Sequence, residues 1–233
     1  MRWAGIFSIL LLLVGCSKGP LVPLAGFDIE IDANGAEQEE IVSWFHESLS
    51  ANLSVPERNV KIRFTTPTLL SAEVPATRVE DAKLFLSNCR ESGGVIFAEV
   101  HRESATFDPE SADIPEGWHW MGFRDPSQSS ILVEKDPYFD ERAIASAERF
   151  SGAGGWALSV NFTPEAADEM GKFTKRLVNE RIAIIVGEEV ISAPVVREPF
   201  STGASITGDF TEAEIAAMEA FLNRPGRMTF RVR

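Results

Sequence analysis

The sequence has few of the residues that build metal sites and disulfides, and its acidic side chains outnumber its basic ones. It has two cysteines, Cys16 and Cys89, and three histidines, His46, His101 and His119, which lack the spacing of a ligand set. The formal net charge is −13, and this acidic field would repel a phosphate backbone. We therefore expect no metal ion, no other cofactor and no nucleic-acid partner.

Catalytic motifs are missing as well. His46-Glu47 lies in a helical pattern, but a zinc protease needs a second histidine at position 50, where this chain has Ser50. The glycines of residues 151–155 (SGAGG) lack the spacing and the lysine of a phosphate-binding loop, and no G-x-S-x-G elbow occurs. We expect no catalytic residues and no enzyme. A hydrolase built on an unrecognised pair of carboxylates stays open as an alternative.

The one long apolar run stands at the N-terminus. Arg2 precedes residues 4–14 (AGIFSILLLLV), and these eleven residues make at most about 17 Å of helix, against a hydrocarbon layer of ~30 Å. The pattern predicts a signal peptide over residues 1–15, not a membrane-spanning helix.

The end of this run resembles the lipobox of bacterial lipoproteins, because residues 13–16 read LVGC. The resemblance implies cleavage before Cys16, lipidation of that cysteine and anchoring in the bilayer through its acyl chains. An ordinary secretory signal with an incidental cysteine is the alternative. Ser17 follows, and under the sorting rule of diderm lipoproteins a residue other than Asp indicates the outer membrane. Residues 16–26 then form the lipidated cysteine and a tether broken by Pro and Gly.

The first half of the mature chain predicts an α+β domain at 27–105. Strand patterns at 27–33, 59–65, 68–75 and 95–101 alternate with helical patterns in the order β-α-β-β-α-β, which is the ferredoxin-like arrangement of two helices on one sheet face. Asn34 with Glu37, and Thr77 with Glu80, have the spacing of helix caps. Cys89 shares an apolar helical face, so we expect a buried core thiol, with a reactive thiol as the alternative. That face also holds Val79, Ala82, Phe85 and Leu86. If Cys16 carries lipid, Cys89 has no partner for an intramolecular disulfide.

The second half predicts another α+β domain at 106–233. Strands are expected at 117–123, 130–135, 156–162, 181–186, 190–196 and 227–233. Helices are expected from Asp140 to about residue 150, from Thr163-Pro164, and after Thr211, where Glu214 completes a capping box. The two apolar runs of 181–196 flank an acidic turn, which indicates a buried hairpin with Ala193-Pro194 at a strand edge or bulge.

This C-terminal half resembles the periplasmic head of SecD, the accessory subunit of the Sec translocase. The resemblance rests on the Thr-Pro helix start and on three stretches in order, AIIVG (183–187), SAPVV (192–196) and GASITGDFT (203–211). It continues, more weakly, upstream through 80–104 and 43–64. It implies a SecD-type base followed by a SecD-type head. In one departure, Gly187-Glu188 stands where the family has Asp before Gly.

SecD proper continues into membrane helices that use the proton gradient, whereas this sequence shows no apolar run of ~20 residues up to Arg233. Proton-driven work by itself is therefore not expected. The resemblance implies an extracytoplasmic, membrane-anchored module that holds emerging or unfolded polypeptide, or contacts translocon components. The alternative is a structural or assembly lipoprotein of an envelope complex with a dedicated folded partner.

The expected polypeptide contacts are residues of the head loops. Trp118 and Trp120 stand close together in a loop-rich stretch, and Pro199 and Phe200 follow the diagnostic hairpin. Aromatic anchors are common at protein interfaces. For the two tryptophans, packing in the core is the alternative interpretation.

Overall fold

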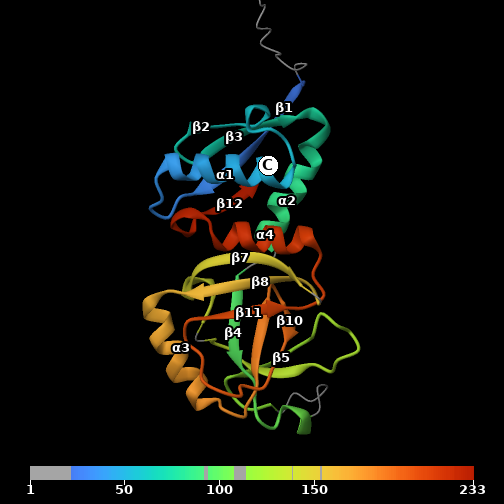
Figure 1. Ribbon diagram of the computed structural model, residues 1–233, viewed down its shortest axis with the longest axis vertical. Coiled ribbons are helices and arrows are strands. Elements are labelled where there is room, and N and C mark those ends of the chain that lie inside the picture. The colour runs from blue at the N-terminus through green and yellow to red at the C-terminus, as the bar shows by residue number, and fades with distance from the viewer. Residues whose placement is uncertain (1–21, 92–93, 108–113, 138, 153) are drawn as a thin grey trace, which may run out of the picture.

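The computed structural model describes residues 22–91, 94–107, 114–137, 139–152 and 154–233, so the predicted signal peptide and Cys16 lie outside the described residues. The chain forms two stacked parts, a base above and a head below, with helix α4 between them (Figure 1). The helices are α1 (Gln38–Asn52), α2 (Val79–Glu91), α3 (Pro164–Arg176) and α4 (Glu212–Leu222). The strands are β1 (Leu24–Asp32), β2 (Lys61–Thr66), β3 (Leu69–Pro75), β4 (Val95–Glu99), β5 (Trp118–Met121), β6 (Ile131–Glu134), β7 (Ile144–Gly152), β8 (Gly155–Phe162), β9 (Ile182–Val186), β10 (Glu189–Ser192), β11 (Gly203–Thr207) and β12 (Thr229–Val232).

The base is an antiparallel sheet in the order β12-β1-β3-β2, with α1 and α2 packed on it (Figure 1). Alternation along β1 places Phe27, Ile29 and Ile31 in the core. The opposite face carries charges such as Glu30 and Glu73. The mixed α+β class and the antiparallel sheets of the prediction are confirmed.

One of the four strands of the base sheet is not the strand that was predicted. Residues 95–101 were expected there, but β4 pairs with β9 in the head, and β12 from the C-terminus pairs with β1. The expectation was wrong because β4 is buried on both faces, with Phe97 in one core cluster and Ala98 in another. The base sheet is covered on one face only and could not bury both sets.

The head contains two three-stranded antiparallel sheets, β10-β9-β4 and β11-β8-β7, around a shared apolar core. All five residues of β9 are buried. The predicted hairpin of 181–196 is confirmed, since β9 and β10 pair around Gly187, whose φ is +63°. The register shifts between Val190 and Ser192, and β10 ends just before Ala193-Pro194. Helix α3 and the two-stranded sheet β5-β6 complete the head.

Helix α4 belongs to both parts. Its N-terminal capping box is present as predicted, with Thr211 and Glu214 bonding each other's backbone. Ile215 and Met218 lie in the head core, while Ala217 lies in the base core. A helix buried on two sides is apolar around most of its circumference, which is the composition of this segment, EAEIAAMEAFL.

Three local predictions were wrong. Residues 144–152 form strand β7 and not a helix, since Asp140 caps only the short 3-10 turn Glu141–Ala143. Pairing with β8 thus overrides the helical propensity of this alanine-rich stretch. Asn34 does not cap α1 but sits in a turn with φ +46°, and Thr77 lies inside the 3-10 turn Ala76–Arg78 before α2.

Candidate functional site

The two tryptophans lie on β5, at the far end of the head from the base (Figure 1). Both are half-buried, so they pack on the head and still show part of their surface. The ring of His101 meets Trp118 edge-on with centroids 4.7 Å apart, and it meets Phe107 at 5.4 Å. The indole Nε1 of Trp120 is buried without a hydrogen-bond partner among the described residues. This aromatic cluster is a surface on which an apolar partner could pack.

His119 lies between the tryptophans on the same strand. Burial lowers its pKa, and the positive charge of Lys135 lowers it further. The ring is therefore neutral at pH 7 and adds no charge to the surface. Within the described part of the chain, its Nδ1 is buried and unpaired.

Pro199 and Phe200 lie elsewhere on the head, in the segment between β10 and β11. Pro199 is exposed, whereas Phe200 is half-buried and packs on the head core. The Thr174 hydroxyl of α3 accepts from Phe200 N at 3.0 Å and lies 2.9 Å from Phe200 O, which fixes the segment against α3.

The four predicted contact residues thus do not form one site. Met121, the neighbour of Trp120, packs against the core cluster that contains Ala183 and Ile185, on one side of the β10-β9-β4 sheet. Phe200 packs against the core cluster that contains Ile184, on the other side. Any polypeptide contact by the tryptophans and by Pro199 would involve opposite faces of the head.

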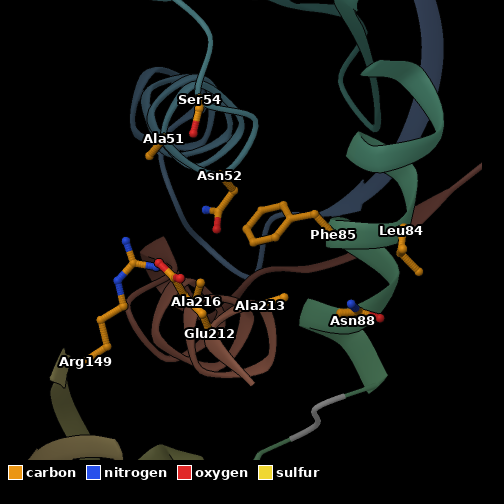
Figure 2. Close-up of a pocket in the computed structure, with 10 residues that line it drawn as sticks. All are labelled: Ala51, Asn52, Ser54, Leu84, Phe85, Asn88, Arg149, Glu212, Ala213 and Ala216. Atoms are coloured by element: carbon orange, nitrogen blue, oxygen red, sulfur yellow. The ribbon is translucent and has the colours of Figure 1, made fainter. Parts of the chain in front are cut away.

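A groove of about 410 Å³ opens where the base meets the head. Figure 2 shows Phe85 pointing from α2 toward Asn52 at the end of α1, with the start of α4 as the floor and Arg149 of β7 at one side. Leu84 stands at the rim with 61% of its surface exposed. The remaining lining residues are small or polar: Ala51, Ser54, Asn88, Glu212, Ala213 and Ala216.

Hydrogen bonds between α4 and β7 hold this junction together. Asn223 Oδ1 accepts from Ala147 N at 2.9 Å, and Asn223 Nδ2 donates to Ala147 O at 2.7 Å. Glu219 accepts from Arg149 N at 2.9 Å and forms an ion pair with the Arg149 side chain at 3.3 Å. Sequence patterns did not predict the groove, because its walls come from four segments that only the tertiary fold brings together.

Cys89 is inside the base and is fully buried, as predicted. Burial raises the pKa of its thiol to about 12, so the thiolate needed for nucleophilic or metal chemistry does not form at neutral pH. Among the residues that the structure describes, no group of three or more His, Cys, Asp or Glu side chains is placed to hold a metal ion. No helix in that same part of the chain is long and apolar enough to cross a membrane.

Comparison with known proteins agrees with this geometry. Residues 119–226 match the family model of the SecDF P1 head subdomain. The SecD translocase subunit of Aquifex aeolicus is 37% identical over 85 residues, which cover 36% of this chain and 17% of the relative. That of Petrotoga mobilis is 40% identical over 86 residues, covering 37% and 18%. The chain therefore spans less than a fifth of the length of these curated relatives.

Solved structures show the same fold. A crystal structure of SecDF in its super-membrane-facing form has a TM-score of 0.57 at 18% identity, covering 90% of this chain and 30% of that one. A second structure, described as SecDF, a membrane component that enhances protein export, has a TM-score of 0.55 at 16% identity, covering 89% and 97%.

The architecture thus defines a mixed α+β domain with antiparallel sheets, of the kind found in SecDF periplasmic domains. Together with the match of residues 119–226 to the SecDF P1 head subdomain and the similarity to SecD subunits, it supports a SecD-family periplasmic domain in this chain.

Proposed function

We propose that this protein is an extracytoplasmic binding module that assists protein export by holding emerging or unfolded polypeptide near the translocon. The observation that carries the proposal is the match of residues 119–226 to the SecDF P1 head subdomain. SecD homology supports a role in protein translocation and an envelope-associated position. We propose that the module acts by binding, without catalysis.

The proposed contact surface is the aromatic cluster around Trp118. Half-buried aromatic rings offer a rigid apolar area that an extended chain can cover at little entropic cost. Pro199 offers a second, separate contact on the opposite side of the head sheet.

Crosslinking tests this surface. A photoreactive amino acid at position 118 is expected to trap nascent or unfolded envelope proteins in cells, identified by mass spectrometry. The matched control places the same group at Thr65, an exposed residue of the base edge strand β2. Equal recovery at both positions would contradict the proposed surface.

The alternative is a structural or assembly subunit with a dedicated folded partner. Binding of a reduced, carboxymethylated model protein, which cannot fold, separates the two functions. We expect the chain to bind this probe and to ignore the disulfide-intact folded form of the same model protein. No binding to the unfolded probe would favour the assembly role.

Lipid anchoring through Cys16 belongs to the same proposal and is supported by the lipobox-like residues 13–16. Two or more acyl chains would hold the module stably at a membrane, and Ser17 favours the outer membrane. Cys16→Ala should move the protein from the membrane fraction to the soluble fraction and abolish incorporation of a clickable palmitate analogue. Unchanged fractionation and labelling would exclude Cys16 as the anchor.

A further inference from the structure

The two three-stranded sheets of the head end in four edge strands: β4, β10, β7 and β11. An edge strand presents a row of N–H and C=O groups to its surroundings, and proteins usually cover or charge such rows. These four edge strands differ in what covers their outward N–H and C=O groups.

The edges of β4 and β10 are covered by other backbone segments. Phe97 N donates to Phe139 O at 2.9 Å along β4. On β10, Val190 N donates to Gly122 O at 2.9 Å, and Val190 O accepts from Arg124 N at 3.0 Å. At Phe97 and Val190 these two edges are therefore bonded to other segments of the protein.

The edge of β7 is covered by side chains of α4. Asn223 bonds both backbone groups of Ala147, and Glu219 accepts from the N–H of Arg149. This edge faces the base and is closed to an incoming strand.

The outward groups of β11 follow from its register on β8. Phe162 N donates to Thr202 O at 3.1 Å, and bonded and non-bonded pairs alternate along an antiparallel ladder. The N–H and C=O groups of Gly203, Ser205 and Thr207 therefore point away from β8. None of them bonds to another residue in the part of the chain that the structure describes.

The β11 edge also lacks the features that discourage pairing. Its sequence, GASIT, contains no charge and no proline, and Ser205 and Thr207 are exposed. The base edge strand β2, by contrast, carries Lys61 and Arg63 and has a register shift near its end. Inward lysines, charges and bulges are the common means of blocking strand addition, and β11 has none of these.

We propose that β11 binds one extended segment of an unfolded polypeptide as an added strand. Three outward residues supply three donors and three acceptors, so a segment of about five residues, some 17 Å long, would match the strand. Main-chain hydrogen bonds carry such binding, so it tolerates many client sequences. The inference rests on the proposed function and names how the client chain is held.

Substitution at Ser205 tests the edge. Ser205→Pro removes the central outward N–H but no bond to β8, because proline is tolerated where a strand's N–H faces outward. We expect it to weaken binding of the reduced, carboxymethylated model protein about tenfold, measured by fluorescence anisotropy with the full chain in detergent. The matched control Ser205→Thr keeps the N–H and should change the affinity less than about twofold. Circular dichroism and thermal unfolding report whether each variant is folded.

Amide hydrogen exchange tests the same edge without any variant. The free protein should protect the N–H of Ala204 and Ile206, which point to β8, and leave those of Ser205 and Thr207 in fast exchange. Adding the unfolded probe should slow exchange at Ser205 and Thr207.

The outcomes separate the two ideas. If the probe binds but neither Ser205→Pro nor exchange at these amides changes, the β11 edge is not the binding site, and the proposed function stands on another surface. If the probe does not bind the unmodified chain at all, the proposed function falls and the inference falls with it.

Discussion

The Asn223 side chain links the end of α4 to the edge of β7. Its removal tests how much these hydrogen bonds contribute to the free energy of unfolding. Asn223→Ala deletes two hydrogen bonds, of 2.9 and 2.7 Å, to the backbone of Ala147. Each such bond contributes about 0.5–1.5 kcal/mol net, so the pair predicts a loss of about 2 kcal/mol. Asn223 itself is exposed, and water can partly replace it, which lowers the expectation to about 1–2 kcal/mol.

For a chain of this length, 1 kcal/mol corresponds to roughly 2–4 °C in Tm, so we expect a decrease of about 3–6 °C. The assay is urea unfolding followed by circular dichroism, with the midpoint and slope fitted separately. The matched variant Asn223→Asp keeps the acceptor for Ala147 N but loses the donor to Ala147 O, and it should lie between wild type and Asn223→Ala. A loss below about 0.3 kcal/mol for the alanine variant would refute the idea that α4 side chains secure the β7 edge.

The remaining predictions concern one glycine and one thiol. Gly203→Ala should destabilise the protein by about 1–3 kcal/mol, since its Cβ would collide with the Val160 carbonyl oxygen. The control Gly152→Ala, at the open end of strand β7, should cost less than about 1 kcal/mol. Equal costs of the two substitutions in urea unfolding would contradict this packing. Cys89 should react with a thiol reagent at pH 8 only after unfolding, because its pKa in the folded chain is about 12. Because the pKa of the thiol is raised in the folded chain, its contribution to stability is full below the pKa of the unfolded thiol and is lost as the pH rises toward 12. The free energy of unfolding of Cys89→Ala should therefore fall less steeply with pH over that range than that of the unmodified protein. Parallel plots of unfolding free energy against pH for the two proteins would exclude the effect.

Local sequence signals were sufficient for several elements. The Thr163-Pro164 start and the capping box of Thr211 satisfy the first N–H groups of α3 and α4 within a few residues. The hairpin of β9 and β10 follows from two apolar runs around a glycine that adopts positive φ. Each of these features depends on residues that are close together in the chain, so it can be recognised from the sequence.

Sequence periodicity indicated that 95–101 and 227–233 are strands, but it could not indicate their partners. Both segments are short, and the burial of β4 on both faces decided which of them joins the base sheet. The same limit applies to β7, whose composition favours a helix, because its strand conformation depends on hydrogen bonds to β8.

By itself, the sequence determined the α+β class, the helix starts, the buried hairpin, the buried thiol and the resemblance to the SecD head, because caps, turns and alternation act over a few neighbouring residues. Only the tertiary structure decided that β12 completes the base, that α4 is buried on two sides and that the β11 edge is left uncovered in the described part of the chain. Those properties depend on which segments contact each other in the folded protein. Pairing between segments that are far apart in the chain produces no periodic pattern in the sequence.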